Sequence, residues 1–427
     1  MYTKRLLKIV AVSSVAAMLA AACSSSSSSS SPSSSAAGSA PAASQMASSA
    51  PAEASASAEP VAPEVPGGSA YAGPVGAGEG QVNVLAWPGY VEDGSTDPAV
   101  DWVTDFETET GCEVNVKTFG TSDEAVKLMQ GGGWDVVSAS GDATLRLIYG
   151  DNVQPLNPDL VPSYADIFED LKLQSFNSVG GVPFGVPHGR GANLLMWNTD
   201  EVAEPLDSWA VTFEADSPYA GKVTAYDSPI FIADAAVYLM ATQPDLGITD
   251  PYSLDQTQFD AAMALLEQQK ALVGEYWSDY TKAIQSFVSG TTAVGTTWQV
   301  IANLAGAEGG NVEAVKPKEG ATGWSDTWMI AKDTPNINCA YLWVDHIASP
   351  KANAAVAEWF GEAPSNAKSC DLTADKDHCA TFHAGDTAYW TDVYYWNTPT
   401  AACIDGRTDV QCVPYSEWGT AWSALRS

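Results

Sequence analysis

Apolar residues recur at two spacings along the chain, and each spacing predicts a type of element. Residues 81–87, 112–119 and 134–138 have the apolar pattern of strands, whereas two intervening segments, from about 98 and from 122, repeat at the helical spacing. Alternating strands and helices predict a parallel α/β lobe, in which ligands are expected at the carboxyl ends of the strands.

The pattern also indicates that the chain leaves this lobe and later returns to it. Residues 182–187 and 194–197 are predicted crossing segments, and a new strand-and-helix series begins at residues 222–226. An apolar strand near residues 327–331 leads back, and about 350 residues after position 80 are enough for two lobes. The predicted division is a discontinuous first lobe at 81–190 and 328–427 and a second lobe at 191–327.

The first residues have the features of an export signal. Three basic residues precede an apolar run at 9–22 that ends at Cys23, and this run is too short to remain as a membrane-spanning helix. Residues 1–22 are therefore expected to be cleaved. The segment before Cys23 resembles the lipobox of bacterial lipoproteins, in which this cysteine is lipidated. The alternative is an ordinary secretory signal with an incidental cysteine.

Residues 23–80 are predicted to be a flexible tether. Ser, Ala, Pro and Gly dominate this segment, which cannot bury enough apolar surface to offset the entropy of ordering. A tether on a lipidated Cys23 lets a folded body meet a partner in the same membrane, or spaces the body through a cell wall. We expect the protein to be exported and anchored on the outer face of the cytoplasmic membrane.

The chain is strongly acidic, with 52 Asp and Glu against 19 Lys and Arg. This excess disfavours nucleic acid as a partner, because its phosphate backbone is also negative. Solubility accounts for most of the charge, and a secondary effect is that an acidic cleft attracts cations.

Six cysteines remain once Cys23 is lipidated, which is an even number in an oxidising compartment. Cys370 with Cys379, and Cys403 with Cys412, each enclose eight residues and are close enough in sequence to form local bridges. The two cysteines that remain would then pair with each other. Fifteen connectivities are possible, and we predict one of them. The predicted pairs are Cys112–Cys339, Cys370–Cys379 and Cys403–Cys412. A metal site is not predicted, because no C-x-x-C pair is present.

Motifs for catalysis are few. The sequence has no G-x-S-x-G, no phosphate-binding loop and no H-E-x-x-H. Ser365 and Lys368 satisfy S-x-x-K, but so short a pattern arises often by chance. An esterase-like or polyester synthase-like enzyme is the disfavoured alternative, and no cofactor is expected.

Aromatic, hydroxyl and carboxylate side chains recur where predicted strands end. These positions are Trp87, Tyr90, Ser140, Asp142, Asp227, Trp298, Trp324 and Asp326. Aromatic faces attract ammonium groups, at about 0.5–2 kcal/mol per contact, and carboxylates hold them by charge-assisted hydrogen bonds. This mixture predicts a site for an alkyl diamine or triamine. Several of the 15 Trp must nevertheless be structural.

Seven blocks after residue 81 resemble the putrescine- and spermidine-binding proteins of bacterial ABC importers. The blocks, in order, are AWPGYV from Ala86, TSDEAVKLM from Thr121, WDVVSASGDATLRLI from Trp134, QPLNPDL from Gln154, YDSPIFIADAA from Tyr226, KPKEGATGWSDTWMI from Lys316 and AEWFGEAPSN from Ala357. The resemblance implies the type II periplasmic-binding fold, with two α/β lobes that close on the ligand by hinge crossings.

The resemblance also implies residue roles. Trp87 and Tyr90 match an aromatic pair, Trp298 matches an aromatic wall, and Trp324 with Asp326 matches a pair that stacks on an amine and neutralises it. Further positions carried over by motif are Asp227, Asp234, Glu362 and Asn397. We expect a monomer that hands a polyamine to permease subunits.

Two departures point to a modified pocket. Ser140 to Asp142 stand where spermidine binders tend to have a tyrosine. Arg190 lies near the expected hinge, where its guanidinium either pairs with a nearby acid and faces away or holds a ligand carboxylate. In the second case, the ligand would be a zwitterionic ω-amino acid similar to gamma-aminobutyrate.

Overall fold

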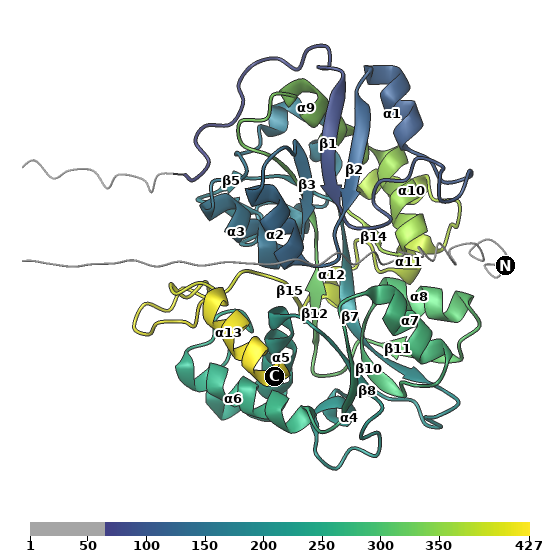
Figure 1. Cartoon of the computed structure of the whole chain (residues 1–427), viewed down its shortest axis with the longest axis vertical. Coiled ribbons are helices and arrows are strands. Elements are labelled where there is room, and N and C mark those ends of the chain that lie inside the picture. Colours follow the sequence, from purple (N-terminus) through teal and green to yellow (C-terminus); the bar gives the residue numbers. More distant parts are fainter. Residues whose placement is uncertain (1–64) are drawn as a thin grey trace, which may run out of the picture. The chain divides into compact units, whose positions relative to one another are not determined.

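The computed structural model describes residues 65–427. The predicted signal segment at 1–22, the predicted lipidation site Cys23 and most of the predicted tether lie outside the described residues. Within 65–427, two mixed sheets with flanking helices form two lobes (Figure 1). None of the helices in this part of the chain is long and apolar enough to cross a bilayer.

The first lobe is built around a five-stranded sheet of order β2-β1-β3-β13-β6. Its strands are β1 (Gln81–Ala86), β2 (Glu113–Thr118), β3 (Val136–Ala139), β6 (Val186–Pro187) and β13 (Thr327–Ile330). The helices of this part of the chain are α1 (Val103–Thr110), α2 (Ser122–Gln130), α3 (Gly141–Tyr149), α9 (Ile337–Ile347) and α10 (Pro350–Phe360). β1 is parallel to β2 and β3, as the alternating pattern predicts, whereas the returning β13 is antiparallel to β3.

The second lobe is built around an eight-stranded sheet whose main order is β15-β12-β7-β10-β8-β9. Its strands are β7 (Gly189–Asn198), β8 (Val223–Tyr226), β9 (Val273–Trp277), β10 (Val294–Trp298), β11 (Val312–Val315), β12 (Ala321–Trp324), β14 (Ala363–Pro364) and β15 (Val393–Tyr395). The helices that accompany it are α4 (Ala210–Phe213), α5 (Ile232–Thr242), α6 (Gln256–Gln269), α7 (Tyr280–Val288), α8 (Gln299–Ala307) and α13 (Tyr415–Arg426). The remaining short strands and α-helices are β4 (Ser178–Val179), β5 (Val182–Pro183), α11 (His378–Thr381) and α12 (Thr387–Trp390).

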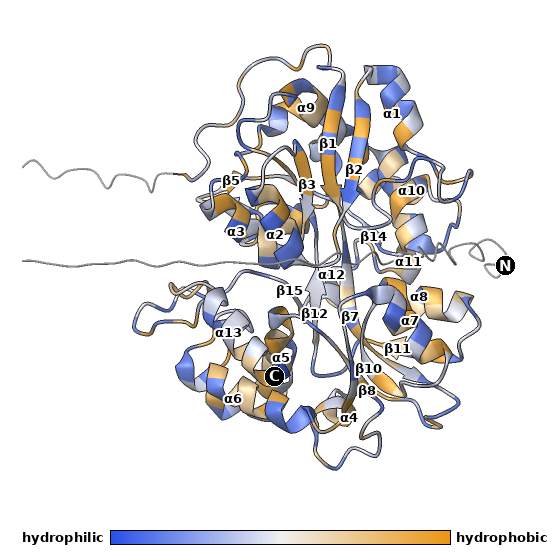
Figure 2. Ribbon diagram, viewed as in Figure 1, coloured by the Kyte–Doolittle hydropathy of each residue, from blue (hydrophilic) through white to orange (hydrophobic). Residues whose placement is uncertain are grey.

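Apolar side chains fill the interiors of both lobes. β3, β10 and the whole of β7 are buried, and Figure 2 shows hydrophobic stretches along β3 and β10. β2 lies at the edge of its sheet, and its apolar residues are less covered than those of the central strands. Val116, for example, is 45% exposed.

Short crossings join the two sheets. His188 links β6 of the first sheet to β7 of the second, and Ser325 with Asp326 links β12 back to β13. A third crossing, at Gly361 and Glu362, leads from α10 to β14, which pairs with β7.

Two predicted boundaries differ from the structure. The tether was expected to reach residue 80, but residues from Val65 onward pack on the first lobe. Glu79, for example, accepts hydrogen bonds from the backbone of Asn338 and Cys339 at 3.0 and 2.9 Å. The end of the chain was assigned to the first lobe, yet β15 pairs with β12 and α13 packs against α6, so both lie on the second lobe.

One helix start differs from the sequence pattern and one agrees with it. α1 begins at Val103 rather than near Pro98, because the side chain of Asp101 accepts hydrogen bonds from the first free backbone N–H groups. α2 begins at Ser122 as predicted, and its N-cap is Thr121, whose hydroxyl accepts a hydrogen bond from the backbone of Glu124. Gly111 ends α1 in the left-handed conformation, with φ 71°, as expected for a glycine in that position.

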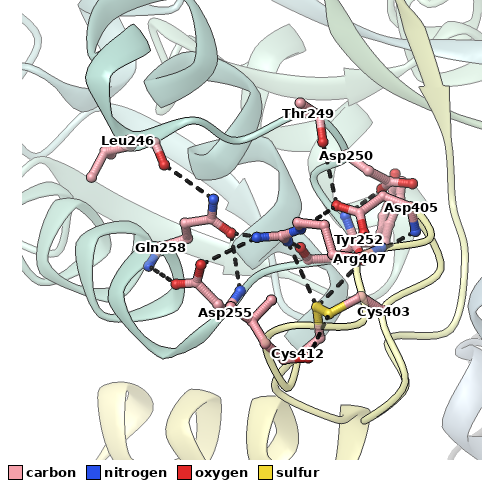
Figure 3. Close-up of polar contacts among 12 residues, drawn as sticks. Leu246, Thr249, Asp250, Tyr252, Asp255, Gln258, Cys403, Asp405, Arg407 and Cys412 are labelled. Carbon is pink, nitrogen blue, oxygen red and sulfur yellow. Dashed lines mark hydrogen bonds and ion pairs between the residues drawn. A yellow bond between two sulfur atoms is a disulfide. The ribbon is translucent and has the colours of Figure 1, made fainter.

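The predicted disulfide pairing is confirmed in full: Cys112–Cys339, Cys370–Cys379 and Cys403–Cys412. Inside the Cys403–Cys412 loop, Arg407 points back onto the second lobe (Figure 3). Its guanidinium donates to Asp405 at 2.7 Å, to Asp255 at 3.2 Å and to the backbone oxygen of Ser253. Because Asp255 is also the N-cap of α6, this arginine fixes the loop to the start of that helix.

Candidate functional site

The carboxyl ends of strands from both sheets meet around a cavity between the lobes. Its lining comes from the residues that follow β1, β3, β9, β12 and β15, from the end of β10 and from the end of α10. The lining residues are Trp87, Pro88, Tyr90, Ser140, Tyr280, Trp298, Trp324, Asp326, Phe360 and Trp396. Strand ends at a junction of two sheets are where an α/β protein is expected to bind a ligand.

Asp326 supplies the charge of this cavity. It is 3% exposed, and its two carboxylate oxygens accept hydrogen bonds from the hydroxyls of Ser140 at 2.6 Å and Tyr90 at 2.9 Å. Burial raises the pKa of Asp326 to about 6, although these two hydrogen bonds act in the opposite direction. Among residues 65–427, Asp326 is the one acidic side chain in the lining.

Aromatic rings form the walls of the cavity and stand nearly perpendicular to their neighbours. Trp298 lies 6.0 Å from Trp87 and 6.1 Å from Trp396, with interplanar angles of 78° and 70°. Phe360 lies 5.8 Å from Trp324 and 4.9 Å from Tyr90, at 87° and 75°. Rings in this edge-to-face arrangement turn different faces and edges toward a shared space.

Three indole N–H groups of these walls have no hydrogen-bond acceptor among the described residues. They belong to Trp87, Trp324 and Trp396, which are 7%, 4% and 3% exposed. A buried donor without an acceptor is costly, so these three unpaired N–H groups set the cavity walls apart from an ordinary apolar core.

The structure brings together six of the predicted ligand-binding residues. Trp87, Tyr90, Ser140, Trp298, Trp324 and Asp326 all line the cavity. The remaining predicted residues do not line the cavity, because their polar groups are held by other side chains or are buried away from it.

Asp142 and Asp234 are buried and do not line the cavity. Asp142 is in the first turn of α3 and accepts a hydrogen bond from Ser122 at 2.8 Å, while Asp234 in α5 accepts from Thr322 at 3.0 Å. Burial raises the pKa of Asp142 to about 6 and that of Asp234 to about 8. Neither carboxyl group is part of the lining.

Asp227 and Asn397 are held by neighbours outside the lining. Asp227 accepts hydrogen bonds from the indole of Trp422 at 3.0 Å and the guanidinium of Arg426 at 3.1 Å, both in α13. The side chain of Asn397 donates to Ser175 at 2.9 Å.

Glu362 is fully buried at a crossing between the lobes. Its carboxyl lies 3.3 Å from Nε2 of His188, whose Nδ1 accepts from the indole of Trp328 at 2.8 Å. Because Nδ1 accepts this hydrogen bond, it carries no proton, and burial lowers the pKa of His188 to about 3. The imidazole of His188 is therefore neutral. Burial raises the pKa of Glu362 well above its usual value, with the negative charge of Asp326 as the second cause.

Arg190 pairs with an acid and does not line the cavity. Its guanidinium donates to Asp170 at 2.7 Å and to the hydroxyl of Tyr395 at 3.2 Å, and it lies 4.5 Å from the ring centroid of Trp390. Of the two arrangements expected for Arg190, the structure therefore shows the paired one.

Four lining residues were not predicted from the sequence: Pro88, Tyr280, Phe360 and Trp396. Trp396 follows β15 directly, so the rule that selected Trp87 would also have found it had this three-residue strand been recognised. Phe360 lies in the block AEWFGEAPSN, of which the resemblance implies a role for Glu362 alone. In the part of the chain that the structure describes, no cluster of His, Cys, Asp or Glu is arranged to hold a metal ion.

Comparison with known families decides the class of protein. Residues 101–380, which are more than half of the chain, match the family described as bacterial extracellular solute-binding protein. This chain belongs to that family. The members are binding proteins rather than enzymes, which agrees with the absence of catalytic motifs from the sequence.

Relatives of this solute-binding protein include the putrescine/agmatine-binding protein of Pseudomonas aeruginosa. That protein is 24% identical over 291 residues, which cover 64% of this chain and 76% of the relative. Among solved structures, the spermidine/putrescine ABC transporter substrate-binding protein PotD of Streptococcus pneumoniae superposes with a TM-score of 0.63 at 18% identity, covering 81% of this chain and 97% of PotD. A structure described as the Atu4243–GABA receptor has a TM-score of 0.57 at 21% identity, covering 81% and 98%. These structures show that the chain has the two-lobe α/β fold of periplasmic binding proteins.

Proposed function

We propose that this chain is the substrate-binding subunit of an ABC importer and that it captures a small organic cation. The observation that carries the proposal is the position of Asp326, a buried carboxylate at one side of a cavity whose walls are aromatic rings. Aromatic faces and a carboxylate together attract an organic cation. Putrescine is the first candidate ligand, because the P. aeruginosa relative is named for binding putrescine and agmatine.

The proposed mechanism is closure of the two lobes around the ligand. Cavity residues come from both lobes, and the crossings at His188, Asp326 and Glu362 provide hinge positions beside the cavity. Micromolar affinity needs about 8 kcal/mol, which aromatic contacts and one desolvated ion pair can supply after ordering costs. Only the closed form would then dock productively on the permease subunits.

Calorimetry with putrescine, spermidine and other small amines tests the proposal. Asp326→Asn is expected to weaken binding at least tenfold, because it removes the charge and keeps the shape. Asp227→Asn is the matched control, because Asp227 is an aspartate outside the lining. The ligand affinity of this variant should be unchanged. Unchanged affinity in Asp326→Asn would show that this cavity is not the binding site. Absence of binding to every organic cation would contradict the proposal as a whole.

A zwitterionic ω-amino acid is a second candidate ligand. The unpartnered indole N–H groups of Trp87, Trp324 and Trp396 favour it, because they can donate to a carboxylate while Asp326 holds the amine. Arg190 does not contribute, since its partner is Asp170. Titration with 4-aminobutyrate and with butylamine, which lacks the carboxylate, separates this candidate from a simple amine.

We also propose that the protein acts as a lipid-anchored monomer on the outer face of the cytoplasmic membrane. The basic residues, the apolar run and Cys23 in the sequence support this proposal. Cys23→Ala should move the protein from the membrane fraction to the soluble fraction. Continued retention of this variant in the membrane fraction would contradict the anchor.

A further inference from the structure

The chain after β15 contacts both lobes in turn, and we refer to residues 396–427 as the C-terminal strap. In Figure 1 this segment runs along the boundary between the lobes before it reaches α13. The first lobe holds its beginning: the side chain of Asn397 donates to Ser175 at 2.9 Å, and the hydroxyl of Thr398 donates to the backbone oxygen of Asp142 at 3.0 Å. The strap therefore leaves the second lobe at β15 and binds the first.

The beginning of the strap lies against the first lobe backbone to backbone. Gly141, the first residue of α3, faces Trp396, and a Cβ atom at position 141 would lie 1.7 Å from the carbonyl oxygen of Trp396. Only glycine allows so close an approach. Trp396 is also one of the walls of the cavity. The strap thus meets the first lobe directly beside the place where the solute is proposed to bind.

The middle of the strap is fixed to the second lobe. The loop closed by the Cys403–Cys412 disulfide is held by Arg407, whose guanidinium donates to Asp255 at the start of α6 at 3.2 Å (Figure 3). α13, which follows this loop, packs against α6 as well. The disulfide loop and α13 therefore belong to the second lobe.

The first residue of α13 nevertheless contacts the first lobe. The ring of Tyr415 lies 4.5 Å from the guanidinium carbon of Arg146 in α3, and its hydroxyl donates to Asp123 in α2 at 3.3 Å. Arg146 and Asp123 are themselves paired at 2.6 Å. Burial raises the pKa of Tyr415 well above its usual value, and the negative charges of Asp142 and Asp123 add to this effect, so the hydroxyl keeps its proton. We call this contact of Tyr415, Arg146 and Asp123 the latch.

The latch and the bond of Thr398 can exist only while the lobes are together. Because the disulfide loop and α13 attach the strap to the second lobe, opening of the lobes would separate Tyr415 and Thr398 from their partners on the first. A contact that is made only in the closed form increases the population of that form. A ligand enclosed between the lobes leaves through the open form, so such a contact also slows its release.

We infer that the C-terminal strap holds the two lobes closed, and that Tyr415, Arg146 and Asp123 are positioning residues that slow release of the bound solute. This inference rests on the proposed function, because it takes the cavity between the lobes as the place where the solute binds. None of these three side chains lines the cavity, so they act on closure rather than on the ligand.

Stopped-flow tryptophan fluorescence of the full folded chain tests the inference, with putrescine and 4-aminobutyrate titrated in parallel. Trp87, Trp298 and Trp396 line the cavity and report binding. For whichever ligand binds, Arg146→Ala and Tyr415→Leu are each expected to raise the dissociation rate at least threefold. The association rate should stay within twofold, because the ligand first meets the open form.

Arg426→Ala is the matched control, because it removes the same kind of contact from within one lobe. Arg426 lies 3.6 Å from the ring centroid of Tyr276 and donates to Asp227 at 3.1 Å, and all three residues belong to the second lobe. The dissociation rate of this variant should be that of the unmodified protein. A general loss of stability would affect this control as much as the latch variants.

Two further variants separate the latch from the rest of the strap. The double variant Arg146→Ala/Tyr415→Leu should dissociate no more than twofold faster than the faster single variant, because both substitutions remove one contact. Thr398→Val removes only the hydroxyl that donates to Asp142, and it should raise the dissociation rate independently of the latch. Fully additive effects of Arg146→Ala and Tyr415→Leu would contradict a shared contact.

The outcomes distinguish this inference from the proposed function. If a ligand binds and a folded Arg146→Ala or Tyr415→Leu variant releases it as slowly as Arg426→Ala does, the inference is wrong and capture of an organic cation stands. If neither ligand binds, the proposed function is contradicted, and small-angle X-ray scattering of the ligand-free chain decides the inference. A larger radius of gyration is then expected for Arg146→Ala than for Arg426→Ala, and equal radii would overturn it.

Discussion

The hydroxyl of Tyr90 donates a hydrogen bond of 2.9 Å to Asp326, and this bond joins the loop after the first strand to a crossing between the lobes. The two residues are 236 positions apart in the sequence. Tyr90 also packs on His188 of another crossing, with ring centroids 4.0 Å apart. The carboxylate of the cavity is therefore coupled directly to the crossings that join the two lobes.

Ligand affinity should fall in acid. Burial raises the pKa of Asp326 to about 6, and a bound cation favours the ionised carboxylate, so binding below this pH must displace a proton. Affinity for the best-binding cation is expected to be about tenfold weaker at pH 5 than at pH 7.5, measured by calorimetry. Asp142→Asn should keep this dependence, because Asp142 is outside the lining. Equal affinity at both pH values would contradict the prediction.

Glu362→Gln should stabilise the protein at alkaline pH. The folded state keeps Glu362 protonated above the pH at which the unfolded chain releases the proton, so the contribution of this carboxyl to stability is full in acid and is lost as pH rises. Glutamine keeps the neutral shape at every pH. The gain is expected to grow by up to about 1.4 kcal/mol per pH unit between the two pKa values. Urea denaturation at pH 4 and pH 8 measures it, and a gain that is larger at pH 4 would show that the sign is wrong.

The Arg190–Asp170 pair should respond unequally to loss of its two members. Asp170→Asn leaves a guanidinium that is only 1% exposed without its counter-charge, which costs about 3–5 kcal/mol in buried pairs. Arg190→Met should cost less, because the side chain of Asp170 is 39% exposed and can be solvated. Denaturant unfolding tests the order, and ligand affinity should be unchanged within twofold in both variants. A loss of affinity in Arg190→Met would place the guanidinium at the ligand.

Removal of the Cys112–Cys339 disulfide should be the most destabilising loss among the three bridges. The two cysteines are 227 residues apart, whereas each of the other pairs is separated by 9 residues. Closing a longer loop restricts the unfolded chain more, and the double alanine variant is expected to lose about 2–5 kcal/mol. Comparison with the Cys370→Ala/Cys379→Ala variant in non-reducing urea titrations checks the order. A larger loss in that second variant would contradict the loop argument.

Local patterns predicted the first strands and helices and part of the aromatic lining of the cavity. Trp87, Trp298 and Trp324 were found because each ends or directly follows a strand, and strand ends at this junction point toward the cavity. The pairing of Cys112 with Cys339 also followed from the spacing of the local pairs. These features depend on short segments or on elimination among few possibilities.

Apart from Asp326, the acids could not be assigned in the same way. Asp227 follows β8 just as Trp87 follows β1, yet Trp422, 195 residues later, binds it outside the lining. The partner of Arg190 is Asp170, and nothing in the spacing of these two residues distinguishes that pair from a ligand contact. Which carboxylate is free depends on distant partners, and hydrophobic periodicity contains no information about them.

The bridge between Cys112 and Cys339 encloses the segment of chain from β7 to β12, which supplies most of the second lobe. An extracellular binding protein is exposed to proteases. A single cleavage in a surface loop of this segment would leave both fragments covalently joined through the first lobe. A nicked molecule would therefore keep its two halves at high local concentration, and it would separate into fragments only under reducing conditions.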